Sequence, residues 1–163
     1  MLLFIVREAT MTNLPFGFDR PEDSPGFLLW QTTITWQRLV KKALEPYDIS
    51  HPQFVIMALL LWFKEQSYDT TQVLIITWSK LDKMTVSQSL KKLAAQGFVD
   101  RVEHKSDTRA KSVTLTEQGK ALICKLVPLV EAVDAHFFST ISSSEQQDLI
   151  KILRKLGGSE THE

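Results

Sequence analysis

Residues 81–101 read LDKMTVSQSLKKLAAQGFVDR, and this stretch decides the fold. Val86, Leu90 and Leu93 stand at positions i, i+4 and i+7, so they share one face of a predicted helix, and that face is expected to be buried. The opposite face carries Met84, Gln88 and Lys91. Hydroxyl, amide and Lys groups on an exposed helix face are typical of elements that contact DNA.

A shorter helix is predicted just before this one and a β-hairpin just after it. Thr70 or Thr71 suits the N-cap of the first helix, and a turn at 79–82 separates it from the second helix, which Asp82 caps. Gly97 predicts a glycine C-cap. The β-prone runs FVDRVEH and KSVTLT then flank KSDTRA, which predicts a hairpin. These are the parts of a winged helix-turn-helix, whose second helix enters the major groove of DNA.

Further helices are predicted on both sides of this unit. Ser24 and Pro25 suit the N-cap and first position of one helix, and ISHPQFVIMALLLWFKEQ predicts a second that is apolar nearly all round. Thr116 caps a long helix expected to reach about Ile141, and SSSE at 142–145 is a capping box that opens a last amphipathic helix. The predicted fold is mainly α with a small β-hairpin wing: a winged helix-turn-helix plus a helical dimerisation region.

The chain of 163 residues has the usual size of one domain. Its first segment is rich in Pro and Gly and predicts an irregular lead-in. The predicted boundaries are 1–24 for the lead-in, 25–157 for one domain and 158–163 for a tail. Within the domain, the predicted winged helix-turn-helix covers about 50–116 and the predicted dimerisation helices about 25–45 and 117–157.

Charge is balanced overall but not locally. Nineteen Lys and Arg residues equal nineteen Asp and Glu residues, so only the distribution of charge can favour nucleic acid. Residues 79–112 hold eight basic and four acidic residues, which gives +4 there and −4 in the rest of the neutral chain. Local positive charge strengthens binding to DNA, because neutralising the phosphates releases their counterions. By itself, this charge fits an ordinary solvated surface equally well.

Two segments carry a resemblance to a known family. LDKMTVSQSLKKLAAQGFVDR resembles the recognition helix of the multiple antibiotic resistance regulators (MarR), and SDTRAKSVTLTEQGKAL resembles their wing, with its Asp-x-Arg and the Leu-Thr-x-x-Gly that follows. HPQFVIMALL and SSSEQQDLIKILRKL are similar to the second and last helices of this family of bacterial winged-helix repressors and activators. The resemblance covers roughly residues 25–157.

The resemblance implies a sequence-specific transcriptional regulator: a cytoplasmic homodimer, most simply a repressor, on a pseudo-palindromic operator in double-stranded DNA. It assigns the minor-groove contact to Arg109, which Asp107 would orient. Gln88 stands where many relatives carry Arg, and a Gln amide can pair bidentately with adenine. The implied DNA-contacting residues are Lys83, Thr85, Ser87, Gln88, Lys91, Lys105, Asp107, Arg109 and Lys111.

The resemblance also implies a small aromatic or phenolic effector, bound between the dimer helices and the winged domain, that releases DNA. Aromatic and basic side chains on the first two helices are the candidates to contact it: Trp30, Trp36, Arg38, His51, Phe54 and Trp62. For each aromatic residue, ordinary core packing is the alternative.

Several other classes of function lack their motifs in this sequence. It has no Gly-x-Ser-x-Gly elbow, phosphate-binding Gly loop, HExxH or paired-Cys spacing, so no enzyme, cofactor or metal site is predicted. Its longest apolar runs are shorter than the roughly 20 residues of a membrane span, so no membrane partner is predicted.

Two alternatives remain within the regulator interpretation. Cys124 lies in the apolar pattern ALICKLV, where a buried, inert thiol is expected and a redox-responsive regulator is the alternative. The segment LIITW at 74–78 is expected to extend the core, but its large residues Ile75, Ile76 and Trp78 could instead face a partner. The second case would suit a winged-helix module that binds protein.

Overall fold

A computed structural model describes residues 14–103 and 111–158 of the chain. In these ranges the helices and strands are α1 (Pro25–Leu44), α2 (His51–Glu65), α3 (Gln72–Ser79), α4 (Lys83–Ala95), β1 (Val99–Glu103), β2 (Lys111–Leu115), α5 (Glu117–Phe137) and α6 (Ser143–Leu156). Single 3-10 turns lie at η1 (Pro21–Asp23), η2 (Glu45–Tyr47) and η3 (Phe138–Thr140). The predicted class, mainly α with one β-hairpin, is confirmed.

The chain divides into two compact units, Met1–Thr35 and Trp36–Glu163, and the division falls inside α1. In the first unit, Ser24 Oγ accepts the N–H of Phe27 at 3.3 Å, which starts α1 as the sequence predicts. The large apolar side chains at the beginning of this helix, Leu28 and Trp30 among them, are exposed. This part of α1 therefore presents an apolar surface without contributing to the buried core.

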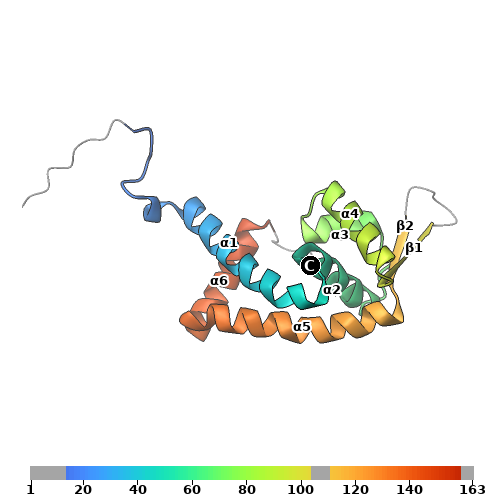
Figure 1. Cartoon of the computed structure of the whole chain (residues 1–163). Coiled ribbons are helices and arrows are strands. Elements are labelled where there is room, and N and C mark those ends of the chain that lie inside the picture. Colours follow the sequence, from blue (N-terminus) through green and yellow to red (C-terminus); the bar gives the residue numbers. More distant parts are fainter. Residues whose placement is uncertain (1–13, 104–110, 159–163) are drawn as a thin grey trace, which may run out of the picture. The chain divides into compact units, whose positions relative to one another are not determined.

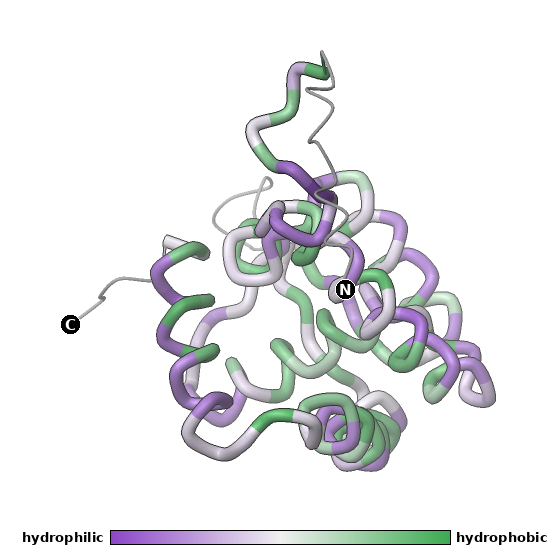
Figure 2. The backbone as a smooth tube through the Cα atoms, turned by 90° about the vertical axis from the view of Figure 1, so that its left-hand side faces the viewer, coloured by the Kyte–Doolittle hydropathy of each residue, from purple (hydrophilic) through white to green (hydrophobic). Residues whose placement is uncertain are grey.

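In the second unit, α5 runs along one side, with α3, α4 and the strands towards one of its ends and α6 at the other (Figure 1). Helix α6 buries none of its side chains within the chain. In Figure 2 the helix that leads to the C-terminus is purple along one side and green along the other. Its green side includes the exposed residues Ile152, Leu153 and Leu156, so the predicted amphipathic last helix is confirmed and its apolar face is uncovered.

Local side-chain caps set the helix ends. Ser50 Oγ accepts the N–H of Gln53 at 3.2 Å while the Gln53 side chain accepts the N–H of Ser50 at 2.9 Å, a complete capping box. Ser142 and Glu145 form the same arrangement in front of α6. The predicted capping box at 142–145 is therefore confirmed.

Helix α5 ends earlier than predicted. The sequence predicts helix to about Ile141, but α5 ends at Phe137 and the chain tightens into η3. Ile141 then has an extended backbone (φ −116°, ψ 149°). The difference arises because Ser142 must adopt the extended conformation of an N-cap, which leaves η3 to change the chain direction.

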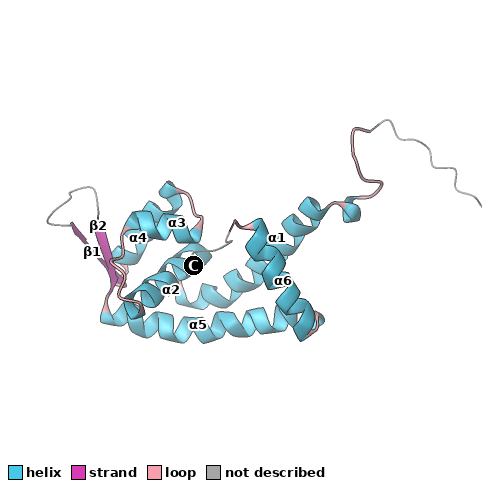
Figure 3. Ribbon diagram, turned by 180° about the vertical axis from the view of Figure 1, so that it is seen from behind, coloured by secondary structure: helices cyan, strands magenta, loops and turns pink. Residues whose placement is uncertain are grey.

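The two strands pair antiparallel, with Val99 opposite Leu115 and Glu103 opposite Lys111. They stand beside α4, as Figure 3 shows from behind. The segment before α3 pairs with β2 on the side away from β1, because the N–H of Val113 donates to the Thr70 carbonyl oxygen at 2.9 Å. The base of the hairpin is thereby tied to the start of α3.

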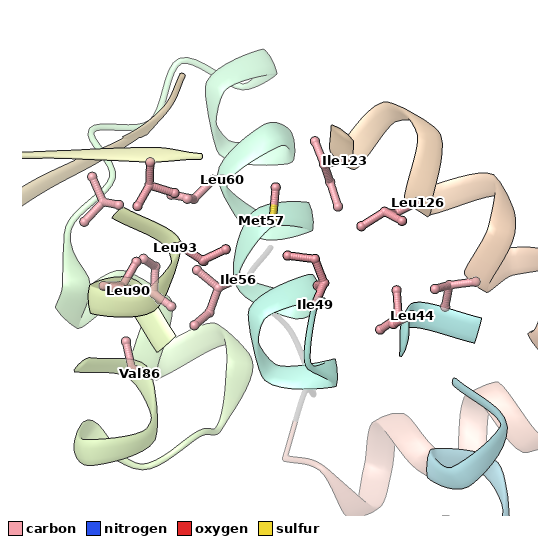
Figure 4. Close-up of a cluster of buried hydrophobic side chains, with 14 of the residues drawn as sticks. Leu44, Ile49, Ile56, Met57, Leu60, Val86, Leu90, Leu93, Ile123 and Leu126 are labelled. Carbon is pink, nitrogen blue, oxygen red and sulfur yellow. The ribbon is translucent and has the colours of Figure 1, made fainter. Parts of the chain in front are cut away.

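Helix α2 is the centre of the core. Figure 4 shows its residues Ile56, Met57 and Leu60 between α4 on one side and α5 on the other. The apolar face predicted for α4 is fully buried, and so are the α5 side chains that oppose it across α2. These residues are Val86, Leu90 and Leu93 of α4 and Ile123 and Leu126 of α5. Helix α2, which the sequence shows to be apolar nearly all round, therefore packs between α4 and α5.

Two predictions of burial are wrong. Ile75 is fully buried and Ile76 packs against the core, but Trp78 is 51% exposed. Trp78 lies in the last turn of α3, at the edge of the core, where it meets the half-exposed ring of Trp62 at 5.3 Å between ring centroids. Cys124 is exposed because the 3.6-residue period turns it away from its buried neighbour Ile123.

Candidate nucleic-acid interface

Helix α4 presents a row of exposed side chains opposite its buried face. Met84, Gln88 and Lys91 are exposed and lie about one helical turn apart, and Lys83 is exposed beside them. Ser87 is half-buried at the edge of this row. Lys83, Gln88 and Lys91, three of the predicted contact residues of the helix, are therefore accessible, and Met84, which was not among the predicted contacts, lies with them.

Asp82 and Thr85 fix the start of α4. One carboxylate oxygen of Asp82 accepts the Thr85 N–H at 2.8 Å and the other accepts the Thr85 hydroxyl at 2.6 Å. The hydroxyl and N–H of Thr85 lower the pKa of Asp82 below its ordinary value. Thr85, a predicted DNA contact, thus already uses its hydroxyl proton within the protein and can offer DNA only an acceptor.

The C-terminal end of α4 is fastened to the loop before α2. Gln96 Nε2 donates to the carbonyl oxygen of Asp48 at 3.0 Å, and the buried Gln53 donates to Gln96 Oε1 at 2.9 Å. Lys92 lies 3.4 Å from the carboxylate of Asp48, but both side chains are well exposed and this ion pair adds little. At this end of α4, the hydrogen bonds of the two amide side chains therefore contribute more than the ion pair.

A second junction joins the exit of α4 to the start of α5. Thr116 Oγ1 donates to the carbonyl oxygen of Gly97 at 2.7 Å and accepts the N–H of Gly119 at 3.0 Å. The Thr116 N–H donates to the carbonyl oxygen of Phe98 at 3.0 Å. Gly97 has φ 81°, a conformation that L side chains rarely adopt. The segment LTEQG at 115–119 therefore fixes the end of β2 to the exit of α4 and to the start of α5.

Most of the predicted wing contacts fall in the sequence between β1 and β2. Lys105, Asp107 and Arg109 fall outside the residues that the structure describes. Lys111 opens β2, where it is the register partner of Glu103. At the base of the hairpin, the Arg101 guanidinium donates to the side chain of Gln72 in α3 at 3.4 Å. The two described strands of the wing are thus bonded to α3 and lie next to α4.

A cavity of about 670 Å³ adjoins the interface. It is lined by the C-terminal part of α1, η2, the start of α2, the turn between α3 and α4, and Lys92 of α4. Trp36 and His51 meet there edge to face at 5.0 Å, and the Trp36 indole N–H donates to Asp134 at 2.7 Å. Burial lowers the pKa of His51, and the nearby Asp134 carboxylate opposes that shift. His51 is therefore mostly neutral at pH 7.

The predicted effector residues are not all brought together. Trp36 and His51 line the cavity, whereas Arg38 is exposed outside its lining and Phe54 packs against the core. Trp62 lies eleven residues beyond His51 on α2, about 16 Å along the axis at 1.5 Å per residue. There it joins a separate aromatic cluster with Phe63, Tyr68 and Trp78. Trp30 belongs to the first unit.

Sequence reasoning missed the charged residues of the cavity. Lys41, Glu45, Asp48 and Lys92 all belong to its lining. Lys92 is brought in only by the packing of α4 against α2, and no local pattern in the sequence marks that contact. In the described ranges, no group of three His, Cys, Asp or Glu side chains is placed to hold a metal, and no helix is long and apolar enough to cross a membrane.

Comparisons with known proteins agree with this architecture. The family model for the ArnR1-like, winged-helix domain matches residues 45–133. The HTH-type transcriptional regulator YdcH of Bacillus subtilis is 35% identical over 139 residues, which make up 82% of this chain and 95% of that protein.

Two solved structures share the fold. CouR from Rhodococcus jostii, bound to p-coumaroyl-CoA, matches with a TM-score of 0.77 and 23% identity, covering 90% of this chain and 100% of that one. A mutant of MarR from E. coli complexed with operator DNA matches with a TM-score of 0.71 and 23% identity, covering 80% of this chain and 91% of that one. The winged-helix assignment thus rests on sequence and on structure.

Proposed function

Because this chain belongs to the ArnR1-like winged-helix family, is related to an HTH-type transcriptional regulator and shares the fold of MarR family regulators, we propose that it is a homodimeric MarR-type repressor that binds a pseudo-palindromic operator and is released by a small aromatic or phenolic effector. The observation that carries the proposal is the exposed row Met84, Gln88 and Lys91 on α4, with the wing beside it. The N-terminal residues of such a helix contact base edges in the major groove. A DNA-binding repressor of this kind works in the bacterial cytoplasm.

The dimer is supported by uncovered apolar surface. Helix α6 exposes Ile150, Ile152, Leu153 and Leu156 while burying none of its residues. The start of α1 likewise exposes large apolar side chains. Exposed apolar side chains of this kind mark an interaction site on each of these helices, and a two-fold dimer would cover them with residues of a second copy. Two copies of α4 would then enter major grooves about 34 Å apart.

The effector site that we propose is the cavity beside α4. The rings of Trp36 and His51 suit an aromatic ligand, and Lys41 and Lys92 suit a carboxylate. CouR, which shares this fold, has been solved with p-coumaroyl-CoA, a phenolic ligand. A ligand carboxylate that draws Lys92 away from Asp48 would act next to the hydrogen bonds that join Gln96 of α4 to Asp48 and Gln53. It would release DNA only if it bound more tightly to the arrangement that does not fit the operator.

Operator binding can be tested with the full chain. A random-sequence selection yields duplexes, and the affinity of a labelled duplex is then measured across a salt series. Lys91→Ala is expected to weaken binding and to reduce the salt slope by about 0.9 for each phosphate that the protein no longer neutralises. The matched control is Lys151→Ala on α6, whose lysine pairs with Asp148, and it should leave the slope unchanged. Equal, weak, sequence-independent binding by all three proteins would argue against the proposal.

The effector site has its own test. Phenolic carboxylates are titrated into the protein–operator complex, and release is followed by fluorescence anisotropy. Lys41→Ala is expected to weaken the response while leaving operator affinity unchanged. Lys42→Ala, also exposed but outside the cavity lining, is the control. If no phenolic carboxylate releases the duplex, or if both variants respond like the original protein, another ligand class or another site must be sought.

A protein-binding module is the second candidate, and one observation favours it. Trp62, Tyr68 and Trp78 form a cluster of half-exposed rings at the ends of α2 and α3. Aromatic residues are enriched at protein interfaces. Under this alternative, Trp78→Ala would abolish activity in the cell while Lys91→Ala would leave it intact. The redox alternative through Cys124 has a thiol that is exposed, and Cys124→Ser would test it by removing any peroxide response.

A further inference from the structure

Met84 is an apolar side chain in an unexpected place. It occupies the second position of α4 and is 69% exposed, whereas Val86, Leu90 and Leu93 of the same helix are fully buried. It therefore contributes nothing to the core. It also lies in one row with Gln88 and Lys91, on the face proposed above to enter the major groove.

We propose that Met84 contacts the C5-methyl group of a thymine in each operator half-site, next to an adenine that Gln88 recognises. Thymine is the base that presents a methyl group in the major groove, and apolar side chains are the groups that recognise it. The thioether chain is flexible and polarizable, so it can adapt to the methyl surface. The inference rests on the proposed operator binding and names the base chemistry that this particular helix would select.

The neighbours of Met84 support this division of roles. The Thr85 hydroxyl donates a hydrogen bond to the Asp82 carboxylate at 2.6 Å, so it cannot donate to a base, and Ser87 is only half-exposed. The remaining outward residue in the second turn is Gln88, whose amide can bond bidentately to adenine N6 and N7. Gln88 thus supplies the polar contact of the row and Met84 the apolar one.

The spacing of the two side chains sets the expected sequence. Residues i and i+4 on a helix have Cβ atoms about 5–6 Å apart. Base pairs rise about 3.4 Å each. The thymine and the adenine should therefore lie one or two base pairs apart, so each half-site should contain two A·T pairs at that separation.

The experiment removes the methyl group and nothing else. Duplexes obtained by random-sequence selection with the full chain are resynthesised with deoxyuridine in place of each half-site thymine in turn. Deoxyuridine keeps the hydrogen-bonding groups of thymine and lacks its C5-methyl group. Affinities are compared for the original protein, Met84→Ala, Met84→Leu and Gln88→Ala. Because Met84 is exposed, its replacement should leave the fold and its melting temperature unchanged.

One thymine per half-site is expected to be sensitive. Replacing it should weaken binding by about fourfold, the factor that corresponds to burial of one CH₂-sized group. Replacement in both half-sites should weaken it by about fifteenfold, as two independent contacts would. Met84→Ala should bind thymine and deoxyuridine duplexes equally, while Met84→Leu and Gln88→Ala should still distinguish them.

Three results would overturn the inference while leaving operator binding intact. The first is specific, salt-dependent binding in which no half-site thymine can be distinguished from deoxyuridine. The second is a discrimination that persists in Met84→Ala, and the third is selection of half-sites made only of G·C pairs. Failure to select any duplex, with weak binding to all sequences, would instead remove the proposed function and the inference with it.

Discussion

A side chain at Gly119 has no room. A Cβ atom at this position would overlap the carbonyl oxygen of Phe98 and lie 2.9 Å from its carbonyl carbon, both backbone atoms that cannot swing away. Replacing Gly by Ala inside a helix ordinarily adds about 1 kcal/mol of stability. Here we expect Gly119→Ala to lower the free energy of unfolding by about 1–3 kcal/mol instead, because of overpacking. Urea unfolding followed by circular dichroism measures it.

The neighbouring substitution Lys120→Ala is the control for that experiment. It leaves the same Ala side chain one residue later in α5, at a position that is only half-buried and that already carries a Cβ atom, and its effect should stay within about 0.5 kcal/mol. A Gly119→Ala protein that unfolds at the original urea concentration or above would show that the backbones of α5 and Phe98 are not in close contact.

Asp82 should make the stability of α4 depend on pH. Its pKa is lowered because its carboxylate accepts the hydroxyl and N–H of Thr85. A lowered carboxyl pKa stabilises the folded state above the ordinary Asp pKa, and this contribution disappears as the pH falls through the lowered value. We expect the melting temperature of the original protein, relative to Asp82→Asn, to fall over that acidic range. A carboxyl signal of Asp82 titrating at or above its ordinary pKa by NMR would contradict this.

Single residues divide into those whose role is local and those whose role depends on packing. The caps Asp82, Thr116 and Ser142 could be predicted because each acts on an N–H within three residues of itself. The exposure of Trp78 and Cys124 could not, since it depends on where a helix ends or which face its partners cover. Burial was predicted for both residues because their neighbours in the sequence are apolar.

Among the elements, the junction between wing, α4 and α5 depends on one hydroxyl. Thr116→Val keeps the shape of the side chain but removes the bonds to Gly97 and Gly119. We expect it to lower the free energy of unfolding by about 1 kcal/mol, the usual value of an N-cap, and to weaken operator binding by loosening the wing. Chemical denaturation and duplex titration measure the two effects.

Thr114 provides the matched control for this substitution. It lies two residues earlier in β2 and is exposed, and a β-branched Val suits a strand as well as Thr does. Thr114→Val should therefore leave stability and DNA affinity nearly unchanged. Equal effects of the two Thr→Val changes would mean that the junction hydroxyl has no special role.

The elements themselves were largely predictable, because amphipathic period, caps and glycine turns all act over a few residues. The end of α5 was not, since the turn at η3 is imposed by the extended Ser142 that follows it. The cavity was predictable only in part. Trp36 and His51 were expected there, but Lys92 comes from a helix more than forty residues away and Asp48 joins it through a left-handed turn (φ 52°).

At the scale of the whole molecule, the exposed apolar face of α6 should control assembly. Leu153→Asp puts a charge into this face without disturbing the core, because α6 buries none of its residues within the chain. We expect the variant to sediment as a monomer and to lose about a hundredfold in operator affinity, since linked half-site contacts gain at least that factor. Analytical ultracentrifugation and duplex titration provide the measurements.

Lys151→Asp places the same side chain on the polar side of α6 and should leave both measurements unchanged. If the original chain already sediments as a monomer, or if Leu153→Asp remains dimeric, then α6 is not the dimer surface. If the monomeric variant binds the operator as tightly as the original protein, the two-fold arrangement of reading helices is wrong.

The uneven charge of this neutral chain affects how it meets DNA. The positive excess lies between residues 79 and 112, around α4 and the wing, and an equal negative excess is spread over the rest. Such a molecule has little net attraction to a distant duplex, but its positive segment is attracted to the phosphates once the two are close. Its association rate should therefore fall with ionic strength although its net charge is zero.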